Sequence, residues 1–265
     1  MTVGQSLLTA KPGVANPGSH HRPLSMKTLA SADRSLPVSG LCRAAFDKTA
    51  AALGLILLIP VFIVAAIAVA VNDGFPVLFR HKRTGRWGRP FELLKFRSMR
   101  VGCAGAEITV DGDTRVTRVG RVLRQYKIDE LPQLWNVLKG DMSLIGPRPL
   151  VPGCADQKDA SWRRVLSVQP GVTDLASLVY RDEERLLATL GEPERYYREY
   201  ILPDKLMLNL HYMNTRCFRK DLSLLFWSAW YSMFPAQFDS ESIRRRFLPH
   251  APLSEPTAET GKYFS

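Results

Sequence analysis

The sequence has few cysteines, and their arrangement points to no chemistry of their own. The four, Cys42, Cys103, Cys154 and Cys217, stand far apart and form no CxxC pair. This spacing favours neither a zinc site nor a disulfide framework, so a reducing compartment fits best. The first forty residues also lack an apolar run followed by a small-residue cleavage site, and no secretion signal is expected.

Negative charge is scarce in the middle of the chain. The formal net charge is +11, and residues 74–148 hold 15 Lys and Arg against 7 Asp and Glu. An anionic partner is therefore expected, and nucleic acid, acidic phospholipid or a phosphorylated small molecule would each satisfy the charge. With 265 residues, the chain is long enough to bury one core with an appendage.

An apolar run precedes this basic region. Residues 49–71 read TAAALGLILLIPVFIVAAIAVAV, which is 23 residues without a charge and exceeds the roughly 20 needed to cross a bilayer as a helix. A buried core helix is the alternative. A helix that is apolar on all sides needs more surrounding protein than this chain offers, so membrane insertion is favoured.

Pro60 divides the run into halves of about 16 Å each as helix, too short to cross alone. Because proline kinks a helix, either two limbs enter and leave on one side or one bent helix spans. Basic residues flank both ends, with Arg43 and Lys48 before the run and, after it, Arg80, Lys82, Arg83, Arg86 and Arg89. Basic flanks stay cytoplasmic, so we favour a re-entrant hairpin.

Aromatic residues crowd a second segment near the C-terminus. Residues 222–234 read LSLLFWSAWYSMF and contain Phe226, Trp227, Trp230, Tyr231 and Phe234. Such residues suit the lipid headgroup layer, but an aromatic stripe at helical spacing also fits a protein core. Both interpretations stay open.

Residues 75–99, FPVLFRHKRTGRWGRPFELLKFRSM, predict two short strands around a glycine-rich basic turn. Side chains alternate along a strand, so Lys95 and Arg97 are expected on one face and Phe96 toward the core. We interpret this hairpin as a phosphate-binding element. A solvated basic edge strand is the alternative.

An acidic pair, Asp129 and Glu130, follows arginines at every third position, Arg115, Arg118, Arg121 and Arg124. Pro132 and Gly140 bracket a predicted helix of two to three turns. Its apolar side is expected to consist of Leu131, Leu134, Trp135 and Leu138.

Two interpretations of Asp129 follow. It is either a helix N-cap, or a carboxylate that the helix start keeps ionised beside a phosphate site. In the second case it can attack phosphorus and form an aspartyl phosphate. Glu130 would then help to hold a divalent ion, most simply Mg²⁺, which prefers oxygen ligands and substrate phosphates. Nearby, Pro147 and Pro149 stiffen the backbone around Arg148, which presents a planar fork for phosphate or forms a rigid surface turn.

These motifs together resemble a known family. KFRSM, the DxR pattern of Asp113 and Arg115, LRQYKIDELPQLWNVLKGDMSLIGPRPL and PGVT resemble the bacterial sugar transferases, the monotopic polyprenol-phosphate phosphoglycosyl transferases. The resemblance covers roughly residues 46–234. It implies a re-entrant membrane helix, a magnesium-dependent ping-pong reaction and Asp129 as nucleophile, with Glu130 as its partner. Lys95, Arg124 and Arg148 match positions expected to serve substrate binding or the active-site framework, and the strand argument adds Arg97.

Some positions depart from the family pattern. His81 stands where Gln is usual, and Asn209 stands where many members have Asp, although Asp221 keeps the later acid. After PGVT the chain reads DLASLVYRDEE instead of a Gly-Trp-Ala-Gln type continuation, so the sugar cannot be inferred. The additional N-terminal transmembrane helices of larger members are absent, and the chain resembles the short form.

The resulting expectation is an α-rich α+β catalytic domain with a re-entrant membrane hairpin and interfacial amphipathic helices. Its predicted parts are a disordered segment (1–42), a membrane helix (43–73), a catalytic domain (74–235) and a C-terminal tail (236–265). It would lie on the cytoplasmic face of a bacterial inner membrane. There it would transfer a sugar phosphate from a UDP-sugar to polyprenol (undecaprenyl) phosphate for exopolysaccharide or other glycoconjugate synthesis, with Mg²⁺ as the expected cofactor.

Other functions are less consistent with the sequence. A phosphohydrolase would use the same aspartate with water as acceptor. A noncatalytic adaptor for anionic lipid is disfavoured because two acids would weaken a basic lipid-binding surface. Nucleic-acid binding ranks last, since no nucleic-acid fold signature appears and the basic region follows a membrane segment.

Overall fold

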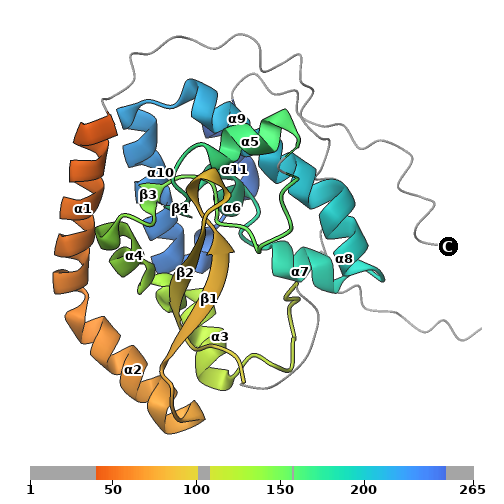
Figure 1. Cartoon of the computed structure of the whole chain (residues 1–265). Coiled ribbons are helices and arrows are strands. Elements are labelled where there is room, and N and C mark those ends of the chain that lie inside the picture. Colours follow the sequence, from red (N-terminus) through yellow and green to blue (C-terminus); the bar gives the residue numbers. More distant parts are fainter. Residues whose placement is uncertain (1–39, 101–107, 157, 249–265) are drawn as a thin grey trace, which may run out of the picture. The chain divides into compact units, whose positions relative to one another are not determined.

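The computed structural model describes residues 40–100, 108–156 and 158–248, which form a helix-rich α+β structure with two small sheets (Figure 1). The expectation of an α-rich α+β fold is confirmed. The disorder predicted for the two ends concerns mainly residues 1–39 and 249–265, which lie outside the described residues, as does Cys103.

The apolar run folds into α1 (Gly40–Leu57) and α2 (Ile59–Asp73), which meet at a bend of 62° (Figure 1, orange). Pro60 lies in the first turn of α2, where its missing N–H group costs no helix hydrogen bond. No single helix in the described ranges is long and apolar enough to cross a membrane. The bent pair meets those requirements only when both helices are taken together.

One side of this helix pair packs on protein and the other does not. Ala51 of α1 and Val69 of α2 are fully buried in two separate apolar clusters. Large side chains elsewhere on the pair are exposed, including Leu57 at 80% and Val71 at 83%. This exposure does not fit the alternative of a buried core helix.

The predicted basic hairpin is confirmed. Strands β1 (Leu78–Thr84) and β2 (Pro90–Phe96) pair antiparallel, with Leu78 opposite Phe96 and Thr84 opposite Pro90. A short turn, η3 (Arg86–Gly88), joins them. Phe96 points into the core, as the alternation predicts.

The acidic pair lies between two helices. Helix α3 (Arg118–Gln125) is followed by the one-turn η4 (Ile128–Glu130) and by α4 (Gln133–Lys139). Gly140 ends α4 with a φ of 90°, the left-handed conformation that glycine adopts without strain. The predicted C-terminal boundary is therefore confirmed.

The predicted apolar side of α4 is only partly correct, since Leu134 packs against the main core cluster but Trp135 does not lie in it. Trp135 is 51% exposed, whereas Gln133, Asn136 and Val137 are buried. Asn136 is buried because its amide bonds to strand β2, donating to the carbonyl oxygen of Glu92 at 2.7 Å and accepting from the N–H of Leu94 at 3.0 Å. Helix α4 is thus joined to the hairpin by polar bonds, and it also packs against α1 and β3.

The second sheet consists of β3 (Ser143–Ile145) and β4 (Gly171–Thr173), which pair in parallel. Just beyond it, the backbones of Gly146 and Gly171 nearly touch, because a Cβ atom on Gly171 would lie 2.0 Å from the nitrogen of Gly146. The N–H of Gly171 also donates to the carbonyl oxygen of Pro147 at 3.0 Å. This close approach fixes the start of the segment that carries Arg148.

The remaining secondary-structure elements of the described chain are helices. They are α5 (Ala160–Leu166), α6 (Leu175–Val179), α7 (Glu183–Ala188), α8 (Pro193–Tyr196), η5 (Tyr197–Ile201), α9 (Leu202–Thr215), α10 (Phe218–Met233), η6 (Pro235–Gln237) and α11 (Ser240–Phe247). The aromatic residues of α10 divide between two environments. Tyr231 is buried, whereas Phe226 is exposed, as is Phe234 directly after the helix, so this helix is partly core and partly surface.

Helix α11 lies in the region where the sequence analysis expects a tail. Ile243 and Phe247, spaced four residues apart, are buried in the main core cluster. Arg244 between them donates to the buried carboxylate of Asp204 in α9 at 3.3 Å. The folded chain therefore continues beyond residue 235.

Candidate active site

A sharp turn places Asp129 and Glu130 in the interior. Lys127 has a φ of 56°, in the left-handed region, and the chain changes direction there between α3 and η4. Asp129 is 4% exposed and Glu130 is 8% exposed. Helix α4 begins only at Gln133, with Pro132 at its N-cap position and no side-chain capping bond. The interpretation of Asp129 as the N-cap of this helix is therefore wrong.

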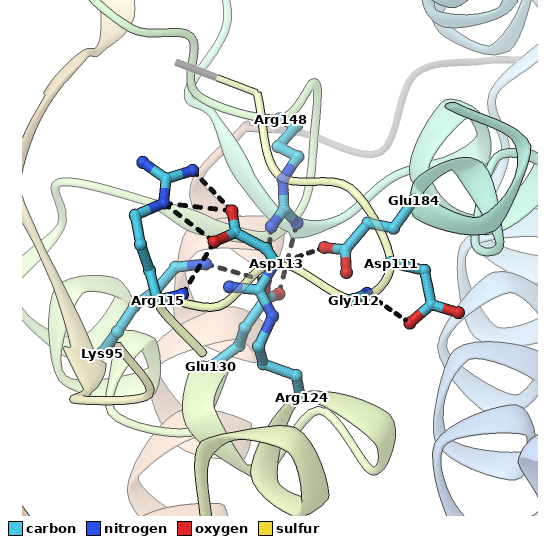
Figure 2. Close-up of polar contacts among 9 residues, drawn as sticks. All are labelled: Lys95, Asp111, Gly112, Asp113, Arg115, Arg124, Glu130, Arg148 and Glu184. Carbon is cyan, nitrogen blue, oxygen red and sulfur yellow. Dashed lines mark hydrogen bonds and ion pairs between the residues drawn. The ribbon is translucent and has the colours of Figure 1, made fainter. Parts of the chain in front are cut away.

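Two cations from distant segments meet at Glu130, as Figure 2 shows. Lys95, near the end of β2, donates from Nζ to Oε1 at 2.9 Å. Arg148, which follows β3, donates from Nη1 to Oε2 at 3.2 Å and from Nη2 to Oε1. The structure thus brings together four predicted site residues, Lys95, Asp129, Glu130 and Arg148.

The two neighbouring carboxyl groups have opposite electrostatic environments. Burial alone would raise the pKa of Glu130, but Arg148 and Lys95 hold that pKa well below its usual value. Burial raises the pKa of Asp129; Lys95 opposes this rise, and the negative charge of Glu130 adds to it. Burial therefore works against the ionised form of Asp129, whereas the nearby cations favour it.

One oxygen of Asp129 has no protein partner. Its Oδ1 atom is buried and forms no hydrogen bond within residues 40–100, 108–156 and 158–248. Most buried polar atoms in proteins are paired, so an unpaired carboxylate oxygen calls for a functional explanation. Both oxygens of Glu130, in contrast, are held by cations.

The backbone of Arg148 is held by a residue that the sequence analysis missed. Asp174 accepts the N–H of Arg148 at 2.9 Å through Oδ2. Its other oxygen caps α6 by accepting the N–H of Ser177 at 2.6 Å. Asp174 directly follows the PGVT motif, and this position is the sequence feature that could have pointed to it. Arg148 is therefore fixed both by its flanking prolines and by Asp174.

The remaining predicted cations lie differently. Arg124, in the last turn of α3, pairs with Glu184 at the start of α7. Its charge acts on Asp129, where it opposes the rise in pKa. Arg97 donates to the carbonyl oxygens of Asp73 and Gly74 at the end of α2.

The expectation that Arg97 and Lys95 serve one surface is not met, because β2 ends at Phe96 and the α2 carbonyl groups attract the guanidinium. The contacts of Arg97 are those of a residue that anchors α2.

The DxR motif folds as a local ion pair beside this site (Figure 2). Arg115 donates from Nε to Oδ1 of Asp113 at 3.0 Å and from Nη2 to Oδ2 at 2.6 Å. The backbone N–H of Arg115 also donates to Oδ1 at 2.9 Å. This bidentate pair stiffens the segment that leads into α3.

The structure gives the contacts of two positions noted in the sequence, the departure His81 and the acid Asp221. Nδ1 of His81 lies 3.1 Å from Nη2 of Arg83, and burial, Arg83 and Lys95 lower the pKa of His81 to about 4. Asp221 accepts from Tyr212 Oη at 2.6 Å and from Arg216 Nε at 2.9 Å, and it also pairs with Arg43. Asp221 therefore links α10 to α1 through buried polar contacts.

The acidic pair suits a metal that is shared with a substrate. No group of three or more His, Cys, Asp or Glu side chains that could hold a metal occurs in the part of the chain that the structure describes. Mg²⁺ commonly uses one or two carboxylates together with substrate phosphates and water. The unpaired Oδ1 of Asp129, next to Glu130, is a donor of this kind.

Comparison with known proteins identifies the family. Residues 38–234 match the model of the bacterial sugar transferase family. The chain is 40% identical over 151 residues to a UDP-N-acetylgalactosamine-undecaprenyl-phosphate N-acetylgalactosaminephosphotransferase of Aeromonas hydrophila, covering 54% of this chain and 35% of the relative. It is 44% identical over 137 residues to a UDP-glucose:undecaprenyl-phosphate glucose-1-phosphate transferase of Caulobacter vibrioides, covering 50% and 51%.

The exopolysaccharide production protein ExoY of Rhizobium meliloti is 32% identical over 185 residues, covering 63% of this chain and 81% of the relative. The match spans about a third of the length of the Aeromonas protein and half that of the Caulobacter protein. The family match itself covers most of the present chain and includes every residue of the site described above. The chain therefore belongs to the bacterial sugar transferase family.

Proposed function

We propose that this protein transfers a sugar phosphate from a UDP-sugar to polyprenol phosphate, with undecaprenyl phosphate as the acceptor, and so initiates exopolysaccharide or other glycoconjugate synthesis. The observation that carries the proposal is the buried, unpaired Oδ1 of Asp129 beside a carboxylate that gathers two cations. The names of the Aeromonas and Caulobacter relatives include an undecaprenyl-phosphate acceptor. Those names include different sugars, so the donor's sugar stays open.

The reaction would proceed in two displacements at phosphorus. In the first, an Asp129 oxygen attacks the phosphorus nearer the sugar, and the bond from that phosphorus to the bridging oxygen breaks, releasing UMP. In the second, a phosphate oxygen of polyprenol phosphate attacks the same phosphorus, and the bond to Asp129 breaks. The product is polyprenyl-diphospho-sugar, and the Asp129 carboxylate is restored. A covalent intermediate divides one difficult transfer into two easier ones.

The residues around Asp129 would bind and neutralise the diphosphate. Lys95 and Arg148 are held close together by Glu130, so their charges are gathered before a substrate arrives. A planar guanidinium can contact two phosphate oxygens at once, and such charge-assisted bonds are stronger than neutral ones. Glu130 would thus organise the phosphate-binding cations as well as act beside the nucleophile.

Magnesium is the proposed cofactor. Asp129, through its unpaired oxygen, and Glu130 would hold the ion together with the diphosphate. A bound Mg²⁺ would supply positive charge that offsets the charge of the phosphates and of the departing UMP. Within the protein, Lys95 and Arg148 already supply part of that charge.

We further propose that α1 and α2 enter the cytoplasmic leaflet of the bacterial inner membrane as a re-entrant pair. The support is the 62° bend, the exposure of apolar side chains and the basic flanks at both ends. Two exposed aromatic residues, Phe226 in α10 and Phe234 directly after it, would lie at the lipid headgroups.

Product analysis tests this function. Purified protein in detergent would be incubated with a panel of UDP-sugars and undecaprenyl phosphate, while UMP release and lipid-linked sugar are measured. The proposal requires UMP and a lipid-linked sugar phosphate in equal amounts. Release of free sugar phosphate without a lipid-linked product would instead identify a hydrolase.

A further inference from the structure

Glu184 contacts the site from a segment in which this chain departs from its family's usual sequence. It is the last residue of DLASLVYRDEE and lies in the first turn of α7. Its Oε1 atom pairs with Nη2 of Arg124, and Figure 2 shows the two side chains reaching toward each other. Among the described residues, no other side chain forms a hydrogen bond or ion pair with Arg124.

Arg124 lies among the charged side chains of the site, as Figure 2 shows. It precedes Asp129 by five residues, and its charge acts on that carboxyl group. The side chain is 22% exposed and that of Glu184 is 41% exposed, so solvent reaches this pair. An ion pair open to solvent is weak and exchanges readily for another anion.

The neighbouring acid, Glu183, belongs to an ion pair that is held more firmly than the pair of Arg124 and Glu184. Glu183 bonds to Lys205, whose ammonium also lies over the rings of Tyr180 and Tyr197 at 5.6 and 5.3 Å. Lys205 is therefore fixed by several groups, whereas Arg124 is fixed by one. Of these two cations, Arg124 is the one that a single competing anion can release.

We propose that Glu184 occupies Arg124 when the donor is absent, and that the donor's diphosphate displaces Glu184 from it. This inference rests on the proposed function, because it takes the nucleotide diphosphate as the ligand. Glu184 would keep the guanidinium near the site while competing with the ligand for it. Removing the carboxylate should therefore tighten diphosphate binding, the opposite of what removing a substrate contact does.

Direct binding tests the inference without any transfer reaction. UDP would be titrated into the full-length protein in detergent by calorimetry, for the parent, for Glu184→Gln and for Glu199→Gln. Glu199 pairs with the exposed Arg195, so its replacement changes the net charge equally at a surface site. We expect Glu184→Gln to lower the Kd for UDP about two- to five-fold, the range that an exposed ion pair accounts for, and Glu199→Gln to leave it unchanged.

The increase in UDP affinity caused by Glu184→Gln must also depend on Arg124. Adding Glu184→Gln to an Arg124→Ala protein should then give no tighter binding than Arg124→Ala alone. Unchanged or weaker UDP binding by Glu184→Gln would overturn the inference, as would a gain that persists without Arg124. If the parent itself binds no UDP, the proposed donor is wrong and the inference falls with it; UDP binding that ignores Glu184 overturns the inference alone.

Discussion

Nζ of Lys95 lies 2.9 Å from Oε1 of Glu130, although 35 residues separate them in the sequence. Arg148 reaches the same carboxylate from a third segment. Asp129, immediately before Glu130, receives no such bond at its Oδ1 from any described residue. Substitution of these two adjacent acids should therefore have different effects on stability.

Glu130→Gln should destabilise the fold by about 2–3 kcal/mol, because it takes from the partly buried Lys95 and Arg148 the carboxylate that both contact. Since the cations lower the pKa of Glu130 when the protein folds, its contribution exists above the unfolded pKa and is lost as pH falls through the lower, folded value. Thermal unfolding measured from neutral to acid pH should show a lower Tm for the variant and a smaller loss in acid. An unchanged Tm at neutral pH would contradict this role.

Asp129→Asn should abolish reaction while leaving the protein folded. Burial raises the pKa of Asp129, so replacing the charge by an amide of similar volume should leave the Tm unchanged or raise it. With a UDP-sugar labelled in the sugar and no acceptor, the parent should retain label and release about one equivalent of UMP, and the variant should do neither. Substantial transfer by Asp129→Asn would rule out the covalent role.

Arg148→Lys keeps the charge but removes the fork that binds two oxygens. We expect transfer to fall by about one to two decades, corresponding to the roughly 1.5–3 kcal/mol of a charge-assisted contact. Glu130 should remain paired, so the Tm should change much less than it does in Glu130→Gln. If Arg148→Lys retains parental kcat/KM, bidentate phosphate binding by Arg148 is not required.

Asn136→Ala should cost about 2–4 kcal/mol of unfolding free energy, because the N–H of Leu94 and the carbonyl oxygen of Glu92 each lose a partner. Trp135→Ala, one residue earlier, is the matched control, since Trp135 is half exposed and should change stability by less than about 1 kcal/mol. Chemical unfolding in detergent measures both. Equal losses would show that α4 is held mainly by apolar contacts.

The re-entrant arrangement predicts that both ends of the chain lie in one compartment. In a background without native cysteines, single cysteines would be placed at Ser31 and Glu255 and treated with an impermeant reagent in intact spheroplasts. Neither should react. Reaction at position 31 alone would identify a spanning segment, and Pro60→Leu should shift the protein toward that outcome because it removes the proline that favours the bend.

Much of the local structure could be predicted because neighbouring residues decide it. Alternating side chains around a glycine-rich turn gave the β1–β2 hairpin, and Gly140 gave the end of α4. The acidic pair and Arg148 stood out by residue type and spacing. Their meeting at one carboxylate depends on the tertiary fold, which no local pattern encodes.

The errors share a physical cause, since burial and partners came from distant segments. Trp135 was expected on the buried side of its helix, but Asn136 is buried instead because β2 supplies the partners of its amide. Arg97 was expected at the phosphate site, but the carbonyl end of α2 binds it instead. The contact between Arg124 and Glu184 spans 60 residues, and nothing near either residue indicated it.

The position of the Asn136 amide has a consequence for how copies of this protein meet. Strand β2 pairs with β1 along one edge. On its opposite edge, the carbonyl oxygen of Glu92 and the N–H of Leu94 form hydrogen bonds with the Asn136 amide. An open strand edge invites pairing with a strand of another molecule and leads to aggregation. Because the side chain of Asn136 ends the sheet at two strands, α4 prevents edge-to-edge growth at this point.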